Sequence, residues 1–471
     1  MRSGCVLPRP WQASRGTGPK IQCDEAGRVV KVDHLDALDA SIERFEYTYN
    51  TDNQKVEVEE YGADTGSDYA GVDYDYDTLH RLTSETRTLV AGQASQLVVS
   101  KDYQYDEGGN IQRMYDVLNY PENVYRDYVY DTEDANWANK NRLIRWQMSN
   151  DTTDKAEFDY DTAGNIETKT VYVNGVEQEE TAYGYRKDNL LDQVQVGEND
   201  AVTYTYDILG RRIAMMVDNV QYQFDYDGDT LLVERGGADL KRSYLQGLGL
   251  IWEKDHTQQG APVAYHYADA HGSTRMLGDA DGDPIARANY DAWGATLDGS
   301  DAVGRFSYAG EWGYKSDSSG YGDAVTGGIM QCGVRYYDPD IGRFLQAEPR
   351  VGLRFTSQSL NRYVYCEGDS PDLVDPRGLS GQQDDPFPDP VGFGVGLANA
   401  GIGDAAAGYA GNVPGKGAGA APGCAIGGAL MTVMEGACLL AEALGAIYHW
   451  YGDVKSMENH GTDTDWLDRN F

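Results

Sequence analysis

The stretch Tyr103-Gln-Tyr105-Asp106-Glu-Gly-Gly109-Asn110-Ile111 contains the pattern that decides the fold of this chain. Its two tyrosines alternate with a polar residue, so both rings lie on one face of a β-strand. Asp106 can open a turn through its side-chain oxygen, and the Gly-Asn pair supplies the positive φ that such a turn needs. Ile111 begins the returning strand. The stretch therefore predicts a β-hairpin.

The same pattern recurs along the first half of the chain at intervals of 20 to 30 residues, a spacing typical of repeat proteins. One hairpin cannot bury its own apolar face, so the repeated hairpins are expected to stack into one large antiparallel sheet. The edges of such a sheet must be covered, which favours coiling, closure or a plug. Val173-Asn174-Gly175-Val176 predicts a further, two-residue hairpin turn. The second tyrosines of the copies are Tyr49, Tyr76, Tyr105, Tyr130, Tyr160, Tyr185, Tyr206 and Tyr226.

The composition agrees with half-buried strands and excludes some functions. The chain has 35 Tyr but 9 Phe, and Tyr can bury its ring while its hydroxyl remains hydrated or hydrogen-bonded. The net charge of −37 argues against nucleic acid as a partner, because a phosphate backbone requires clustered Lys and Arg. Solubility and a salty habitat are two simpler explanations of the acidity. The six cysteines contain no CxxC pair, which argues against structural zinc and leaves the redox state open.

Two motifs follow the repeats. The first is Gly333-Val-Arg335-Tyr-Tyr-Asp338-Pro-Asp-Ile-Gly342-Arg-Phe-Leu-Gln-Ala-Glu348-Pro349. The second is Asp375-Pro-Arg-Gly-Leu379-Ser380, after which the composition changes abruptly. We interpret the first motif as a plug that closes the sheet, and the second as the point where the chain leaves it.

These residues together resemble the RHS/YD-repeat proteins. The resemblance rests on the Tyr-Asp-x-x-Gly-Asn/Arg repeats and on His271-Gly-Ser-Thr-Arg275 and Tyr290-Asp-x-Trp-Gly294. The two later motifs resemble the RHS-associated core of that family, and the likeness covers about residues 27–379. It implies a hollow β-sheet shell around a variable C-terminal polypeptide, often a toxin. It further implies self-cleavage after the Asp-Pro-x-Gly-Leu sequence, here between Leu379 and Ser380.

The family resemblance also assigns candidate catalytic residues. Glu348 stands where the family usually has an aspartate, Asp375 matches the second acid, and Arg335 matches the catalytic arginine. Two acids held close together cannot both ionise, so one can act as general acid while the other activates water. The additional methylene of Glu348 changes the geometry of this pair. In an alternative interpretation, Arg335, Asp338, Arg343 and Glu348 form an ion-paired plug without chemistry, and Asp338 caps a turn.

The sequence and the resemblance together divide the chain into five segments. We expect an all-β protein in which a large coiled antiparallel sheet of hairpins forms a shell, with a small, mostly helical or disordered tail. The apolar stretch 424–450 fits a buried helix better than a membrane-active segment, because two glutamates lie within it. The segments are residues 1–26 (disordered or fragmentary), 27–330 (repeat shell), 331–379 (plug and self-cleavage region), 380–397 (linker) and 398–471 (variable C-terminal domain).

The function favoured by these expectations is a shell that encloses its own C-terminal segment and releases it by a single-turnover, aspartyl-type cut. The alternatives are a cell-surface adhesion or carbohydrate-binding protein without proteolysis, and a remnant with an inactive tail. Other expected partners are a target-cell surface, an immunity protein or a delivery protein, which favours a secreted or cell-surface location. We expect no cofactor and no metal. Asp279-Ala-Asp-Gly282-Asp-Pro284 resembles a calcium loop but lacks the distal glutamate, so a hairpin turn is preferred.

Overall fold

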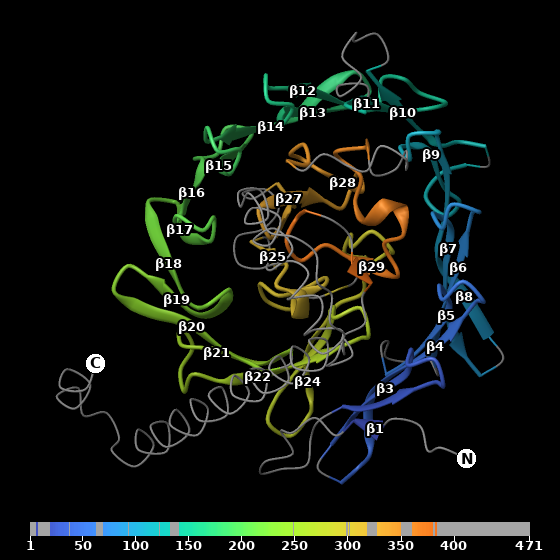
Figure 1. Cartoon of the computed structure of the whole chain (residues 1–471), viewed down its shortest axis with the longest axis vertical. Coiled ribbons are helices and arrows are strands. Elements are labelled where there is room, and N and C mark those ends of the chain that lie inside the picture. Colours follow the sequence, from blue (N-terminus) through green and yellow to red (C-terminus); the bar gives the residue numbers. More distant parts are fainter. Residues whose placement is uncertain are drawn as a thin grey trace, which may run out of the picture. The chain divides into compact units, whose positions relative to one another are not determined.

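The computed structural model divides the chain into two units, Met1–Pro386 and Phe387–Phe471, and the labelled strands of Figure 1 belong to the first. The second unit lies outside the described residues, as do Ser380, the expected tail 398–471 and the apolar stretch 424–450. The described residues are 6–7, 19–36, 38–62, 69–92, 94–121, 123–131, 141–247, 249–297, 300, 302–317, 327–349, 360–379 and 382–383.

Within these residues, 24 strands form one antiparallel sheet in which each strand pairs with the next along the chain. The predicted all-β fold with a large antiparallel sheet of repeat hairpins is confirmed. The strands are β1 (Val6–Leu7), β2 (Lys20–Cys23), β3 (Val29–Leu35), β4 (Ser41–Tyr49), β5 (Lys55–Tyr61), β6 (Tyr69–Tyr76), β7 (Leu82–Ala91), β8 (Ala94–Tyr105), β9 (Ile111–Asp116), β10 (Arg126–Tyr130), β11 (Leu143–Met148), β12 (Lys155–Tyr160), β13 (Ile166–Val173), β14 (Val176–Tyr185), β15 (Leu191–Val196), β16 (Val202–Tyr206), β17 (Arg212–Val217), β18 (Val220–Asp227), β19 (Thr230–Gly236), β20 (Asp239–Gln246), β21 (Leu250–Asp255), β22 (Val263–Ala268), β23 (Thr274–Gly278) and β24 (Pro284–Arg287).

In five copies, the side chain of the residue after the second tyrosine builds the turn between strands; these residues are Asn50, Asp77, Asp106, Asp161 and Asp207. Between β8 and β9, Asp106 Oδ1 accepts the amides of Gly108 and Asn110, each at 2.8 Å, and Oδ2 accepts the Asn110 side chain at 2.8 Å. Gly109 has a φ of +79°, a left-handed conformation that glycine adopts without strain. Asn174 and Gly175 also have positive φ and join β13 to β14, as the sequence predicts.

The second tyrosine of each copy links neighbouring hairpins. Its hydroxyl donates to the carbonyl of the residue that begins a strand in the preceding copy, as Tyr105 does to Leu82 at 2.6 Å. A β-bulge precedes each of these tyrosines, and bulges bend a strand and increase its twist. We call this series of bonds the tyrosine ladder. Its other donor–acceptor pairs are Tyr49–Val29, Tyr76–Lys55, Tyr130–Ile111, Tyr160–Leu143, Tyr185–Ile166, Tyr206–Leu191 and Tyr226–Arg212.

The segment after β24 packs against the inner face of the sheet (Figure 1). Tyr363 donates to the carbonyl of Gly164 at 2.7 Å, and the hydroxyls of Tyr336 and Tyr206 lie 3.0 Å apart. The core of the unit lies between this segment and the large sheet, and it is rich in buried tyrosine. The segment contains a four-stranded sheet, β25 (Lys315–Ser316), β26 (Met330–Cys332), β27 (Arg335–Asp338) and β28 (Arg343–Phe344), the pair β29 (Leu373–Val374) and β30 (Gln382–Gln383), and the 3-10 turns η2 (Gly310–Trp312) and η4 (Cys366–Gly368).

The early and late strands of the large sheet meet through buried ion pairs. Arg275 on β23 makes two contacts with the carboxylate of Glu60 on β5, at 2.7 and 2.9 Å. Arg287 on β24 contacts Glu43 on β4 at 2.8 Å. Side chains therefore join β4 and β5 to β23 and β24, although the described residues contain no backbone hydrogen bonds that pair these early strands with the late ones. We call this contact between early and late strands the seam.

Removing one ladder hydroxyl is expected to destabilise the sheet. In Tyr105→Phe the buried carbonyl of Leu82 loses its donor, so the free energy of unfolding should fall by about 1–3 kcal/mol. Tyr172→Phe, a half-buried tyrosine outside the ladder, is the matched control. Chemical denaturation followed by tryptophan fluorescence measures both variants. Equal stability of the two variants would contradict the role assigned to the ladder.

Candidate functional site

The three residues that the resemblance selected meet at one nitrogen atom. Arg335, at the start of β27, places its Nη2 2.8 Å from Glu348 Oε2 and 3.1 Å from Asp375 Oδ2. Arg335 and Asp375 are buried, whereas Glu348 is half-buried. Two carboxylates from separate loops thus share one guanidinium group, which offsets part of their charge in a site with little solvent.

The same site holds the backbone that precedes the predicted cut. Asp375 Oδ1 accepts the amide of Leu379 at 2.9 Å, and Arg335 Nε donates to the carbonyl of Gly378 at 2.5 Å. Beyond the cut, the backbone of β30 pairs with β29, so the chain is held on both sides of the Leu379–Ser380 bond. Ser380 itself lies outside the described residues.

Two glycines make this close approach possible. Gly378 has a φ of +64°, and a Cβ at this position would lie 2.4 Å from the carbonyl oxygen of Cys332. A Cβ on Gly333, whose φ is +56°, would lie 2.2 Å from the backbone of Arg377. The turn between β26 and β27 therefore packs directly on the backbone of the Asp-Pro-Arg-Gly-Leu motif. The glycine in that motif is required by space as well as by conformation.

The alternative ion-paired plug is formed only in part. Arg335 and Glu348 are paired, but Asp338 Oδ2 accepts Lys169 Nζ at 2.8 Å. Asp338 Oδ1 accepts the amide of Asp340 at 2.9 Å, so it caps the turn that the sequence predicts. Arg343 donates to the side chain of Asn110 and to the carbonyl of Asn141.

Comparisons with known proteins agree with this architecture. A family described as the teneurin YD-shell matches residues 23–241. The chain is 30% identical over 267 residues to the tRNA3(Ser)-specific nuclease WapA of Bacillus spizizenii. The aligned region covers 54% of this chain and 11% of that protein. It is 25% identical over 348 residues to the toxin subunit YenC1 of Yersinia entomophaga, and this alignment covers 65% of this chain and 33% of that protein. The crystal structure of TcdB2-TccC3 superposes with a TM-score of 0.51 at 17% identity, over 80% of this chain and 20% of that one.

Residues 23–241 belong to the YD-shell family. The chain spans about a tenth of the length of the WapA relatives that it matches. The likeness to TcdB2-TccC3 supports the fold of the YD-repeat shell, and the residues described above supply the chemistry of its candidate site.

Sequence reasoning missed several residues that support the site. Tyr314 accepts the amide of Asp375 at 2.6 Å through its hydroxyl. The backbone amide of Glu348 donates to the carbonyl of Arg362 at 2.7 Å, and Arg362 Nε donates to the carbonyl of Glu348 at 2.8 Å. The guanidinium of Arg335 lies 3.5 Å above the ring of Phe344, and burial lowers the pKa of this guanidinium. Phe344 belongs to the first of the two quoted motifs, whereas Arg362 and Tyr314 lie outside both of them.

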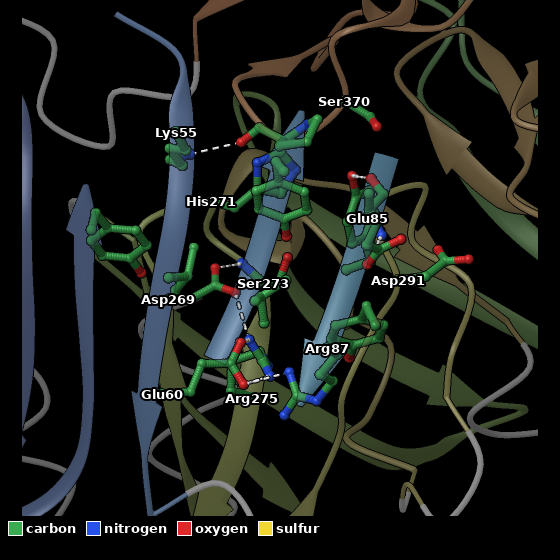
Figure 2. A pocket seen from close by; sticks show the side chains of 18 residues that line it. Lys55, Glu60, Glu85, Arg87, Asp269, His271, Ser273, Arg275, Asp291 and Ser370 are labelled. Carbon is green, nitrogen blue, oxygen red and sulfur yellow. Dashed lines mark hydrogen bonds and ion pairs between the residues drawn. The ribbon is translucent and has the colours of Figure 1, made fainter. Parts of the chain in front are cut away.

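A second group of buried charges lies beside the seam (Figure 2). Glu85 accepts the amide of Ala292 at 2.9 Å, and the neighbouring Asp291 accepts Lys101 Nζ at 2.7 Å. Burial, together with the charge of Asp291, raises the pKa of Glu85 to about 8. Burial likewise raises the pKa of Glu43 at the seam to about 7. Burial therefore favours the protonated form of both carboxyl groups, and at Glu43 the contact with Arg287 opposes this effect.

The raised pKa of Glu85 predicts that the shell loses stability as the pH rises. Its stabilising contribution is complete below pH 4.5, the ordinary pKa of the group, and is lost as the pH passes through 8. The loss should reach a few kcal/mol at most, since one pKa unit corresponds to about 1.4 kcal/mol.

Thermal unfolding from pH 5 to pH 9 tests this prediction. Glu85→Gln keeps an oxygen that can accept from Ala292, so it should flatten the fall in stability. Substitution of the exposed Glu107 by Gln is the control and should follow the original chain. A Glu85→Gln protein with the same pH dependence as the original chain would refute the assignment.

Proposed function

We propose that this YD-repeat shell encloses the polypeptide that follows residue 379 and cuts its own chain between Leu379 and Ser380. The observation that supports this proposal most strongly is the position of Asp375. One of its oxygens accepts the amide of Leu379, and the other shares Arg335 Nη2 with Glu348. Two acids and the backbone amide of Leu379, the last residue before the proposed cut, thus lie in one largely buried site.

The reaction that suits this arrangement is hydrolysis by a pair of carboxyl groups. One carboxyl group of the Glu348–Asp375 pair takes a proton from water as its oxygen adds to the carbonyl carbon of Leu379. The other gives a proton to the nitrogen of Ser380 as the carbon–nitrogen bond breaks. One water is consumed, and the products are a carboxyl group on Leu379 and an amine on Ser380. Arg335 acts as a positioning residue because it holds both carboxylates and the carbonyl of Gly378.

The glutamate at position 348 is compatible with this role. Its longer side chain reaches Arg335 Nη2 at 2.8 Å, a normal distance for a charge-assisted contact. The backbone of Glu348 is fixed by its two hydrogen bonds to Arg362.

The relatives suggest what the shell delivers. Their names describe a tRNA nuclease, a double-stranded DNA deaminase toxin of Burkholderia cenocepacia and a toxin subunit. We infer that residues 380–471 are a toxic cargo of the shell, and that a delivery or immunity protein is a partner. This inference also favours an extracellular or cell-surface site of action. In the part of the chain with described structure, no helix is both long and apolar enough to cross a bilayer.

Purified full-length protein tests the cut on a denaturing gel with intact-mass analysis. The expected result is two fragments, the smaller of which begins at Ser380. Asp375→Asn and Glu348→Gln should each slow the cut at least a hundredfold, because each removes one member of the acid pair. Glu348→Asp keeps a carboxyl group at the position and should cleave at least as fast as the original chain.

A single full-length band from the unmodified chain would refute the proposal and favour the adhesive alternative. Cleavage of both acid variants at the original rate would refute the role of the acid pair. Thermal unfolding of the variants provides the control that they remain folded.

A further inference from the structure

The loop that precedes Asp375 is anchored on the first repeats of the sheet, more than three hundred residues earlier in the chain. Lys55 Nζ donates to the carbonyl of Pro371 at 2.7 Å (Figure 2). The backbone amide of Lys55 donates to both carboxylate oxygens of Asp372, each at 3.1 Å. Tyr76 donates to the carbonyl of Lys55 at 2.8 Å and to Asp372 Oδ2 at 3.2 Å. These bonds tie the loop to the start of β5 and the end of β6.

This anchor is buried on both sides. Lys55 is 4% exposed and Asp372 is 5% exposed, and Lys55 Nζ lies 3.9 Å from Asp372 Oδ1. Removing one partner of a buried charged pair leaves the other without compensation, so such a pair forms only when both elements are in place. A second contact lies next to it, because Gln54 Nε2 donates to Asp369 Oδ2 at 3.2 Å.

The anchored loop is close enough to Asp375 to fix its position. Asp372 and Asp375 are separated by the two residues of β29, and the amide of Leu373 donates to the carbonyl of Asp369 at 3.0 Å. A shift of Asp372 is therefore transmitted along a short, bonded strand to Asp375. Displacements of about 1 Å at a reacting group can cost about a hundredfold in rate.

The strand that carries the anchor also carries the seam. Lys55 begins β5, and Glu60 on the same strand makes the buried pair with Arg275 of β23. Strand β5 is thus held at one point by the late strands of the sheet and at another by the loop before the cut. Its position depends on the meeting of the early and late strands.

We propose that Lys55 and Asp372 are positioning residues for self-cleavage, and that they place Asp375 only when the first repeats have docked at the seam. The cut would then follow completion of the shell, so that the tail is not separated from an unfinished container. This inference rests on the proposed cleavage between Leu379 and Ser380.

The first test compares cleavage rates in full-length variants. Lys55→Met and Asp372→Ala should each slow the appearance of the Ser380 fragment at least tenfold. Lys55→Arg keeps a donor for Pro371 and Asp372 and should recover much of the rate. The matched control is Lys101→Met, which removes another Lys–Asp contact, between Lys101 Nζ and Asp291 Oδ2 at 2.7 Å. In this contact the lysine is half-buried and the aspartate is buried, and neither residue belongs to the loop before Asp375. Lys101→Met should cleave at the original rate even if it lowers the melting temperature by as much as Lys55→Met does.

The second test does not depend on cleavage. Hydrogen exchange is measured by mass spectrometry in a Glu348→Gln background, with and without Lys55→Met or Lys101→Met. Lys55→Met should speed exchange in the peptide 373–379 at least tenfold, because the amide of Leu379 loses its fixed partner on Asp375. Lys101→Met should leave this peptide protected.

The outcomes separate the two proposals. An unmodified chain that stays intact refutes cleavage, while the exchange test still decides whether Lys55 orders the site. A chain that cleaves equally fast with and without Lys55→Met overturns the positioning role and leaves cleavage standing. Equal exchange in the Lys55→Met and Lys101→Met proteins also overturns it.

Discussion

The shell depends on one recurring bond, from a tyrosine hydroxyl to the carbonyl at the start of a strand in the preceding repeat. Backbone bonds of the sheet join strands along their length, but they do not fix the curvature of the whole. The ladder acts at the bulge that ends each hairpin strand, where the backbone pairing is interrupted. There are eight such bonds, and each ties one hairpin to the hairpin before it. This repeated link explains why the strands follow one another around the inner segment.

The inner segment completes the core that the hairpins leave open. Tyr336, Tyr337, Phe344 and Tyr365 are almost fully buried there. A motif dominated by aromatic residues is thus held on several repeats at once, and Arg335 on the same strand as Tyr336 becomes fixed in space. The acid pair is consequently a product of the whole sheet, although Glu348 and Asp375 are 27 positions apart in the sequence.

The sequence was most informative where residues repeat or match a motif. The spacing of the second tyrosines predicts the hairpins, and the match of Arg335, Glu348 and Asp375 to the family predicts a group that the structure brings to one nitrogen atom. The seam has no comparable signal, because Glu60 and Arg275 are 215 residues apart. Arg275 belongs to a motif that carries the family resemblance, but nothing in the sequence pairs it with Glu60. Lys55 and Asp372 were missed for the same reason. Pairs that form only through the curvature of the sheet cannot be found from local patterns.

Cleavage in water enriched in oxygen-18 tests most directly whether the two acids at Arg335 hydrolyse the bond that they hold. Mass spectrometry of the larger fragment after proteolytic digestion locates the label. Hydrolysis by water predicts one heavy oxygen in the new carboxyl group of Leu379 and none in the fragment that begins at Ser380. A cut at any other bond, or a Leu379 carboxyl group formed in the enriched water without the label, would contradict the account.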